Sequence, residues 1–198
     1  MKDEIKSELA LHMRELGLHM IGKGLVNATF AEILFPYNQA MAIIHIGHGA
    51  ELIIKARIAE EHPLLIFSSI PKSSSSVESK LGIIDLLEKG QTFGYAELPE
   101  RLWAVTGDIV PGIDVYNKFG KLRNQIIHLA VPDERLADIA LSFGFGVLEK
   151  LVNMWWDETL LSYAVSYDTE YLFYVFEQLD RLNIEINYRN DGYDIIKK

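Results

Sequence analysis

Residues that act on phosphate esters gather in one short segment, Arg123-Asn124-Gln125-Ile126-Ile127-His128. Lys118, Lys121 and Arg123 supply positive charge for RNA within residues 115–132, a stretch that contains no acidic residue. A guanidinium binds two phosphate oxygens at once, and a histidine, with an ordinary pKa of about 6.5, transfers protons at neutral pH. Together they could cleave RNA without a metal. The histidine would act as general acid or base, and the arginine would stabilise the charge of the phosphorane.

The spacing of Arg123 and His128 decides how they could share one phosphate. On an ideal α-helix, residues five apart point about 140° away from each other, at about 100° per residue. A distorted helix or long side chains would bring the two groups together, or a two-fold interface would complete the site with the second subunit's pair. The alternative is that Arg123 is solvated and that His128 is a boundary histidine.

A second polar set, His48, Glu51 and Lys55, lies on an otherwise apolar helix that we predict over residues 37–61. Spacings of three and four residues place an imidazole, a carboxylate and an ammonium in one row. Polar groups inside a helical bundle cost free energy unless they are paired, so the row needs internal partners or a function. The alternative is a solvated stripe with an ordinary Glu51–Lys55 ion pair.

No metal and no other cofactor is predicted. His45 and His48 are three residues apart, but a di-metal carboxylate bundle needs Glu-x-x-His pairs on two helices, and the chain lacks them. The absence of cysteine excludes Cys-ligated zinc, iron–sulfur clusters and thiol nucleophiles. The remaining histidines, His12, His19 and His62, are predicted to be surface or boundary residues.

The elements that position these side chains are predicted to be helices. Apolar residues at three- and four-residue spacing over 3–20 indicate an amphipathic helix, which Gly22 and Gly24 are expected to loosen. Pro63 ends the helix over 37–61. Further helices are predicted over residues 79–89, 99–105, 113–130, 133–158 and 169–182.

The fold class that follows is all-α, a single helical domain over 1–198 with an irregular insertion at about 62–112. Serines at 73–76 indicate a flexible loop within the insertion. The tail at 184–188 alternates like a strand but has no obvious partner. Aromatic residues crowd residues 155–176, and we expect them to serve packing or dimerisation rather than base stacking, because acidic residues surround them.

Composition and charge exclude several classes of protein. With 198 residues, of which 49% are hydrophobic and 24% charged, the chain can bury a core. The net charge of −9 argues against a general nucleic-acid coat, although a local basic patch is compatible with it. No secretory signal and no membrane span is predicted. Since the chain has no cysteine, a reducing compartment and hence a cytoplasmic location are expected.

The segment 123–128 resembles the signature of HEPN domains, in which an Arg, often followed by a polar residue such as Asn, precedes a His by a few residues. The runs at 45–57 and 61–67 are also similar to the buried helix of the Abi-like or uncharacterised prokaryotic branch of that family. The resemblance covers about 37–156 and leaves a C-terminal helix and tail at 157–198.

The resemblance implies an up-and-down helical bundle that forms a homodimer, in which the Arg and His of both subunits face a shared cleft. It implies a metal-independent endoribonuclease of toxin–antitoxin or phage-defence type, with RNA as substrate and an antitoxin as a possible partner. Arg123 and His128 would be catalytic, and Asn124 would orient or bind the RNA backbone. Glu51, with His48 second, would support the site from the buried helix.

Two alternatives remain open at this point. A catalytically inactive HEPN-like module would bind RNA, a nucleotide or a partner protein, with Arg123 and His128 holding a phosphate or the dimer. A plain helical structural protein, in which the motif arose by chance, is the other alternative.

Overall fold

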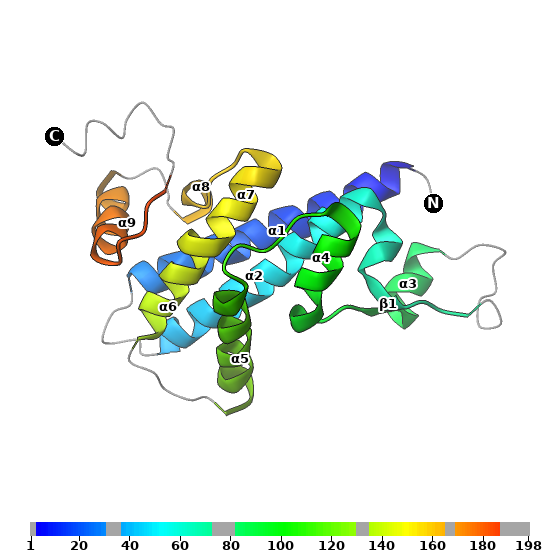
Figure 1. The fold of residues 1–198 in the computed structure, drawn as a ribbon, viewed down its shortest axis with the longest axis horizontal. Helices are drawn as coiled ribbons and strands as arrows, with labels where there is room; N and C mark the ends of the chain where they lie inside the picture. Colours follow the sequence, from blue (N-terminus) through cyan, green and yellow to red (C-terminus); the bar gives the residue numbers. More distant parts are fainter. Residues whose placement is uncertain (1–2, 31–36, 73–81, 130–134, 165–168, 187–198) are drawn as a thin grey trace. The chain divides into compact units, whose positions relative to one another are not determined.

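The computed structural model shows a predominantly α-helical chain (Figure 1). The structure describes residues 3–30, 37–72, 82–129, 135–164 and 169–186. These residues fall into two compact units: unit 1 comprises Met1–Gly17 and Glu51–Ile109, and unit 2 comprises Leu18–Ala50 and Val110–Lys198. The all-α prediction is therefore confirmed at the level of fold class, with a small two-stranded sheet in addition.

Helix α1 (Asp3–Thr29) runs without a break through both glycines that were expected to loosen it, so that prediction is wrong. The physical reason is close packing inside unit 2. A Cβ atom at Gly22 would lie 2.2 Å from the carbonyl oxygen of Tyr163, and one at Gly24 would lie 2.5 Å from Cγ1 of Ile46. Glycine at these positions lets neighbouring segments approach the helix instead of ending it.

Helix α2 (Tyr37–Glu61) has the bounds predicted from the apolar pattern and Pro63. Its first part belongs to unit 2 and its last part, from Glu51, to unit 1. Apolar side chains are buried around most of the circumference of α2, which explains why its sequence shows no single apolar stripe. The buried isoleucines are Ile43, Ile46, Ile53, Ile54 and Ile58.

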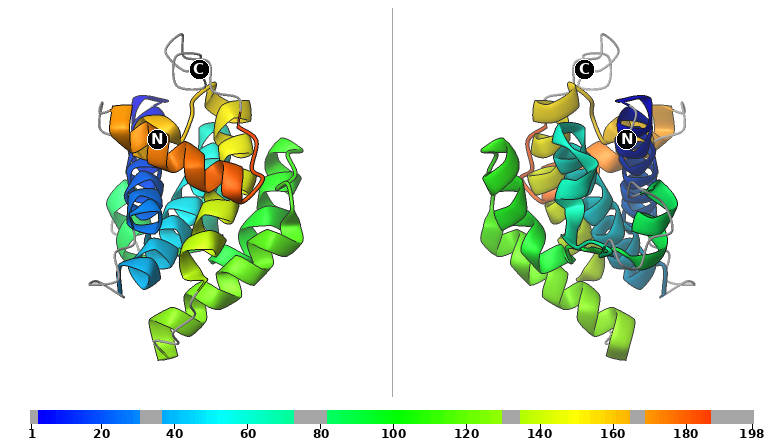
Figure 2. Two further views of the ribbon diagram at one scale, coloured as in Figure 1. Left: turned by 90° about the vertical axis from the view of Figure 1, so that its left-hand side faces the viewer. Right: turned by 90° about the vertical axis from the view of Figure 1, so that its right-hand side faces the viewer.

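In unit 2, helix α5 (Ile113–Leu129) packs beside helix α6 (Leu136–Phe143), as the two views of Figure 2 also show. The ring of Phe143 stacks on Phe119 with centroids 4.0 Å apart and meets Tyr116 edge to face. Aromatic pairs of this kind add to the stability that burial alone provides. The predicted helix over 113–130 is thereby confirmed for residues 113–129, and residue 130 lies outside the described part.

The predicted helix over 133–158 is confirmed for residues 136–156 as one helical run with an irregular turn in its middle, and residues 133–134 lie outside the described part. It consists of α6, a π-helical turn η4 (Gly144–Leu148) and helix α7 (Glu149–Trp156). A π-helical turn accommodates one residue more than the surrounding α-helix requires. Apolar periodicity continues on both sides of such a turn, so the sequence pattern predicts the helix but not its irregularity.

The C-terminal part of unit 2 contains the short helix α8 (Leu161–Ala164) and the helix α9 (Thr169–Arg181). Phe176, like the aliphatic residues around it, is buried, and Tyr174 meets Phe30 edge to face, which fits the expected packing role of the aromatic residues. Residues 184–186, whose sequence alternates like a strand without an obvious partner, form no strand, and residues 187–188 lie outside the described residues.

Unit 1 contains the segment that was predicted as an irregular insertion. Strand β1 (Phe67–Ser69) pairs antiparallel with strand β2 (Gln91–Thr92), and two strands this short carry no readable alternation in the sequence. The predicted loop at 73–76 lies outside the described residues. The helical elements of this segment are η1 (Pro63–Ile66), α3 (Ile83–Lys89), η3 (Tyr95–Glu97) and α4 (Leu98–Thr106).

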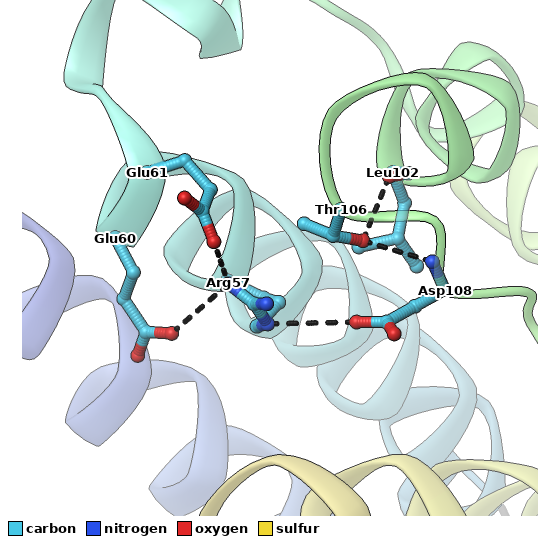
Figure 3. Close-up of polar contacts among 6 residues, drawn as sticks. All are labelled: Arg57, Glu60, Glu61, Leu102, Thr106 and Asp108. Atoms are coloured by element: carbon cyan, nitrogen blue, oxygen red, sulfur yellow. Dashed lines mark hydrogen bonds and ion pairs between the residues drawn. The ribbon is translucent and has the colours of Figure 1, made fainter.

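Arg57 fixes the chain after α4 against the end of α2 (Figure 3). Its guanidinium lies 3.5 Å from Asp108 and also pairs with Glu60 and Glu61 on its own helix. Thr106 donates a hydrogen bond to the carbonyl of Leu102 and accepts one from the N–H of Asp108. These contacts hold the turn that begins at the left-handed Gly107.

Among the helices the structure describes, none has the length and apolar character that crossing a membrane requires.

Candidate phosphate-binding site on helix α5

Helix α5 carries most of the predicted site residues, and its burial pattern decides where they point. The helix starts after Gly112, whose carbonyl accepts hydrogen bonds from the N–H groups of Val115 and Tyr116. Its buried side is formed by Tyr116, Phe119, Gly120 and Ile126. The opposite side is exposed, so each site residue belongs to the core or to the surface according to its helical angle.

Arg123 lies on the buried side of α5 and is itself half-buried. A Cβ atom at Gly47 of α2 would lie 2.7 Å from Cδ of Arg123. The aliphatic part of the Arg123 side chain therefore packs against α2 at Gly47, where glycine leaves room for it because it has no Cβ atom. The sequence pattern identified Arg123 but not Gly47, because glycine in a helix gives no sign of what packs against it.

His128 lies on the opposite, exposed side of α5 together with Asn117, Lys121 and Asn124. Successive spacings of four, three and four residues place these four exposed side chains in one row, which we call the α5 stripe. Within the described part of the chain, His128 makes no hydrogen bond or ion pair. Its imidazole is therefore open to a ligand from solvent.

Within a single chain, Arg123 and His128 lie on different sides of α5. Helix α5 is α-helical throughout, so no distortion reduces their angular separation of about 140°. A distorted helix therefore does not bring Arg123 and His128 to the same phosphate. A second subunit that supplies the missing partner is compatible with the geometry.

The polar row on α2 divides between the two units. Lys55, only 7% exposed, donates a hydrogen bond of 2.7 Å to Glu51 and one of 3.0 Å to the hydroxyl of Thr92 on β2. The Glu51–Lys55 ion pair is therefore present, and Lys55 also fixes the strand β2 to α2. His48 is half-buried, one residue after Gly47. Lys118, the remaining predicted residue, is exposed on α5.

His45 has an unusual environment that its sequence position did not indicate. It is half-buried on α2, and its Nδ1 atom is buried without a hydrogen-bond partner in the described residues. Burial, and then the charge of Lys23 on α1, lowers the pKa of His45 below the ordinary value. No group of three or more metal-ligating side chains forms around it or elsewhere among the residues that the structure describes.

The other histidines lie as predicted. His12 and His19 are exposed on α1, and His19 meets Tyr163 edge to face. His62 caps η1, because its Nδ1 accepts a hydrogen bond of 3.2 Å from the N–H of Leu64. This is a local structural role at the boundary between α2 and η1.

Sequence reasoning missed Arg135, at the N-cap of α6, and Asp138 on α6, which line a groove beside α5 together with Lys118. No motif connects residues so far apart in the sequence, and only the packing of α5 against α6 brings them together.

The fold and the site thus define a predominantly α-helical protein with a cationic and histidine-bearing face on α5. Comparison with protein-family models, with curated proteins and with solved structures finds no match for this chain.

Proposed function

We propose that the chain is a HEPN-like, metal-independent endoribonuclease whose site is built on α5 and completed in a homodimer. The observation that carries the proposal is the α5 stripe, on which an exposed His128 follows Asn124 and Lys121 along a stretch without acidic residues. Such a face attracts a phosphate backbone even on a chain of net charge −9, because phosphate contacts act over short distances in salt.

In the proposed reaction, His128 takes the proton from a ribose 2′-hydroxyl, and the 2′ oxygen attacks the adjacent phosphorus. Arg123 stabilises the charge of the phosphorane, and Lys121 and Asn124 hold the RNA backbone. The bond from phosphorus to the 5′ oxygen breaks, and that oxygen leaves with a proton from the imidazolium or from water. The products are a 2′,3′-cyclic phosphate and a 5′-hydroxyl.

A second copy of the chain would bring Arg123 of one protomer to His128 of the other. The apolar side chain of Ile113, 41% exposed, lies beside the α5 stripe at a helical angle about 20° from that of Asn124, and that of Ile127, 46% exposed, lies about 60° from it toward the buried side. Exposed aliphatic groups next to a polar row are typical of an interface. On this proposal the protein acts in the cytoplasm, and an antitoxin would restrain it by covering the same face.

The alternative is a catalytically inactive HEPN-like module that binds RNA, a nucleotide or a partner protein. The observation that favours it is the divergence of Arg123 and His128 within one chain, since a binding face does not require them to converge.

Mixed-sequence labelled RNA incubated with the protein in excess chelator tests the proposal. We expect 2′,3′-cyclic phosphate ends with the wild type, their loss with His128→Ala and Arg123→Ala, and no loss with His12→Ala, which removes another exposed histidine. No cleavage by the wild type, together with weaker RNA binding by Arg123→Ala, would support the inactive module instead.

Mixing the Arg123→Ala and His128→Ala chains tests the composite site. Random pairing makes half of the dimers mixed, and each mixed dimer keeps one of its two sites, so about a quarter of wild-type cleavage should return. If the pair acted within one chain, the mixture would remain as inactive as its components.

A further inference from the structure

The groove between α5 and α6 lies on a different side of α5 from the α5 stripe. It encloses about 730 Å³, within the range of small-molecule sites. Its lining residues are Val115, Lys118, Phe119, Leu122, Arg135, Asp138, Ile139 and Ser142. All of them belong to unit 2.

The walls of the groove are apolar and partly open to solvent. Phe119 is held in place by its stack on Phe143, whereas Val115 remains 43% exposed. Leu122 and Ile139 contribute further aliphatic surface and are also incompletely buried. A ligand with an apolar part would remove this surface from water.

The charged groups at the groove favour an anion. Lys118 comes from α5, and Arg135 lies at the N-cap position of α6. The carboxylate of Asp138 is already ion-paired with Arg181 of α9. Two cationic side chains thus line the groove and its one carboxylate is ion-paired with Arg181, which favours an anionic ligand over a cationic one.

We propose that this groove binds a small carboxylate with an aliphatic tail. The carboxylate lies between Lys118 and Arg135, and the tail covers Val115, Leu122 and Ile139. The volume suits a small molecule, and the combination of an aliphatic wall with cationic groups matches an amphipathic anion better than a fully charged one. This proposal is independent of the proposed ribonuclease.

Octanoate is the probe, with 1-octanol and inorganic phosphate as matched ligands that lack the charge or the tail. In titrations followed by amide chemical shifts, octanoate should bind more tightly than either control and should shift resonances of α5 and α6. Equal binding of octanoate and 1-octanol, or of octanoate and phosphate, would overturn the proposal, as would shifts confined to other elements.

Two lysine-to-glutamine variants test where the carboxylate of the ligand binds. Lys118→Gln removes a charge from the groove, and Lys121→Gln removes one from the α5 stripe three residues away. We expect about tenfold weaker octanoate binding with the first, because a charge-assisted contact is lost, and wild-type binding with the second. Both exchanges are on the surface, and unchanged thermal unfolding would show that the fold is intact. Equal affinity of the two variants would overturn the assignment.

Discussion

Burial shifts the pKa values of two titratable side chains of unit 2, the carboxyl group of Glu149 and the imidazole of His45. Glu149 is 5% exposed and accepts a hydrogen bond of 2.7 Å from the N–H of Leu160, just before α8. Burial raises its pKa, while the hydrogen bonds from Leu160 and Thr159 oppose the rise. His45 shows the opposite shift for the same reason, since burial disfavours its charged form.

Glu149→Gln should make the stability of the protein less dependent on pH. Because the folded pKa is raised, the folded state binds more protons than the unfolded state between pH 4.5 and the folded pKa. The stability that Glu149 contributes at low pH is therefore lost as pH rises through that interval. Gln does not titrate, so the stability of the variant does not fall for this reason. Urea unfolding of both proteins from pH 4.5 to 7 measures the difference.

Glu149→Ala is the contrasting variant, because it leaves the N–H of Leu160 without its acceptor. We expect a loss of about 1–3 kcal/mol in the free energy of unfolding at neutral pH. If Gln and Ala had the same effect, the hydrogen bond to Leu160 would not be what this side chain provides.

His45→Gln should remove a loss of stability that the wild type suffers in mild acid. Since the folded pKa of His45 lies below 6.5, the unfolded state binds more protons between these two values. Stability is therefore complete above pH 6.5 and falls as pH decreases toward the folded pKa. Measured by urea unfolding, the free energy of unfolding of the variant relative to the wild type should therefore increase as the pH falls from 7 toward the folded pKa, and a constant difference would show that His45 is not responsible.

Lys23→Gln isolates the second cause of the His45 shift, because it removes the charge and retains the stem. The imidazole resonances of His45 should then titrate at a higher pH than in the wild type. Lys121→Gln, on α5, is the control and should leave that titration unchanged.

At the scale of elements, the glycines of α1 and α2 determine how closely segments of unit 2 approach. Gly22→Ala should destabilise the protein by about 1–3 kcal/mol, because the new Cβ meets the backbone of Tyr163, which cannot move aside. Thermal unfolding measures the loss. The control is Gly146→Ala, where a Cβ would meet no described atom within 4 Å apart from its chain neighbours and the backbone of its own helix.

Gly47→Ala displaces Arg123 without removing it. The three atoms nearest to the added Cβ all belong to the flexible side chain of Arg123, which can move away, and alanine favours the helix by about 1 kcal/mol over glycine. The variant should therefore unfold at or above the wild-type temperature and yet lose RNA cleavage. Retained cleavage would show that the contact with Gly47 does not position the guanidinium.

Element boundaries were predictable from the sequence where apolar periodicity met a proline or glycine, as at Pro63 and Gly112. The basic run on α5 was also visible, because residues 115–132 contain no acid. What could not be predicted is the side of the helix on which each residue lies, since burial of Arg123 and exposure of His128 depend on packing against α2. The groove between α5 and α6 could not be predicted for the same reason, because it depends on how the two helices pack.

At the scale of the whole molecule, the net charge of −9 opposes RNA binding, so binding has to come from local basic groups such as those of α5. If Lys118, Lys121 and Arg123 neutralise three phosphates of a single strand, the logarithm of the binding constant should fall with the logarithm of salt concentration at a slope of about −2. Fluorescence anisotropy across a salt series measures this slope. Lys121→Gln should lower its magnitude, whereas Lys150→Gln on α7 should not.

The π-helical turn at Gly144–Leu148 absorbs one residue between α6 and α7 without changing the faces that the two helices bury. Deletion of Gly146 would remove the extra residue and close the run into a continuous α-helix. Because the wide turn takes up that residue locally, α7 should keep its buried face, and Glu149 should still accept the hydrogen bond from the N–H of Leu160. In evolutionary terms, this is a position where the chain can gain or lose one residue without exchanging the core face of a helix for its surface. Related chains that lack the turn should therefore be one residue shorter here and keep the core side chains of α7.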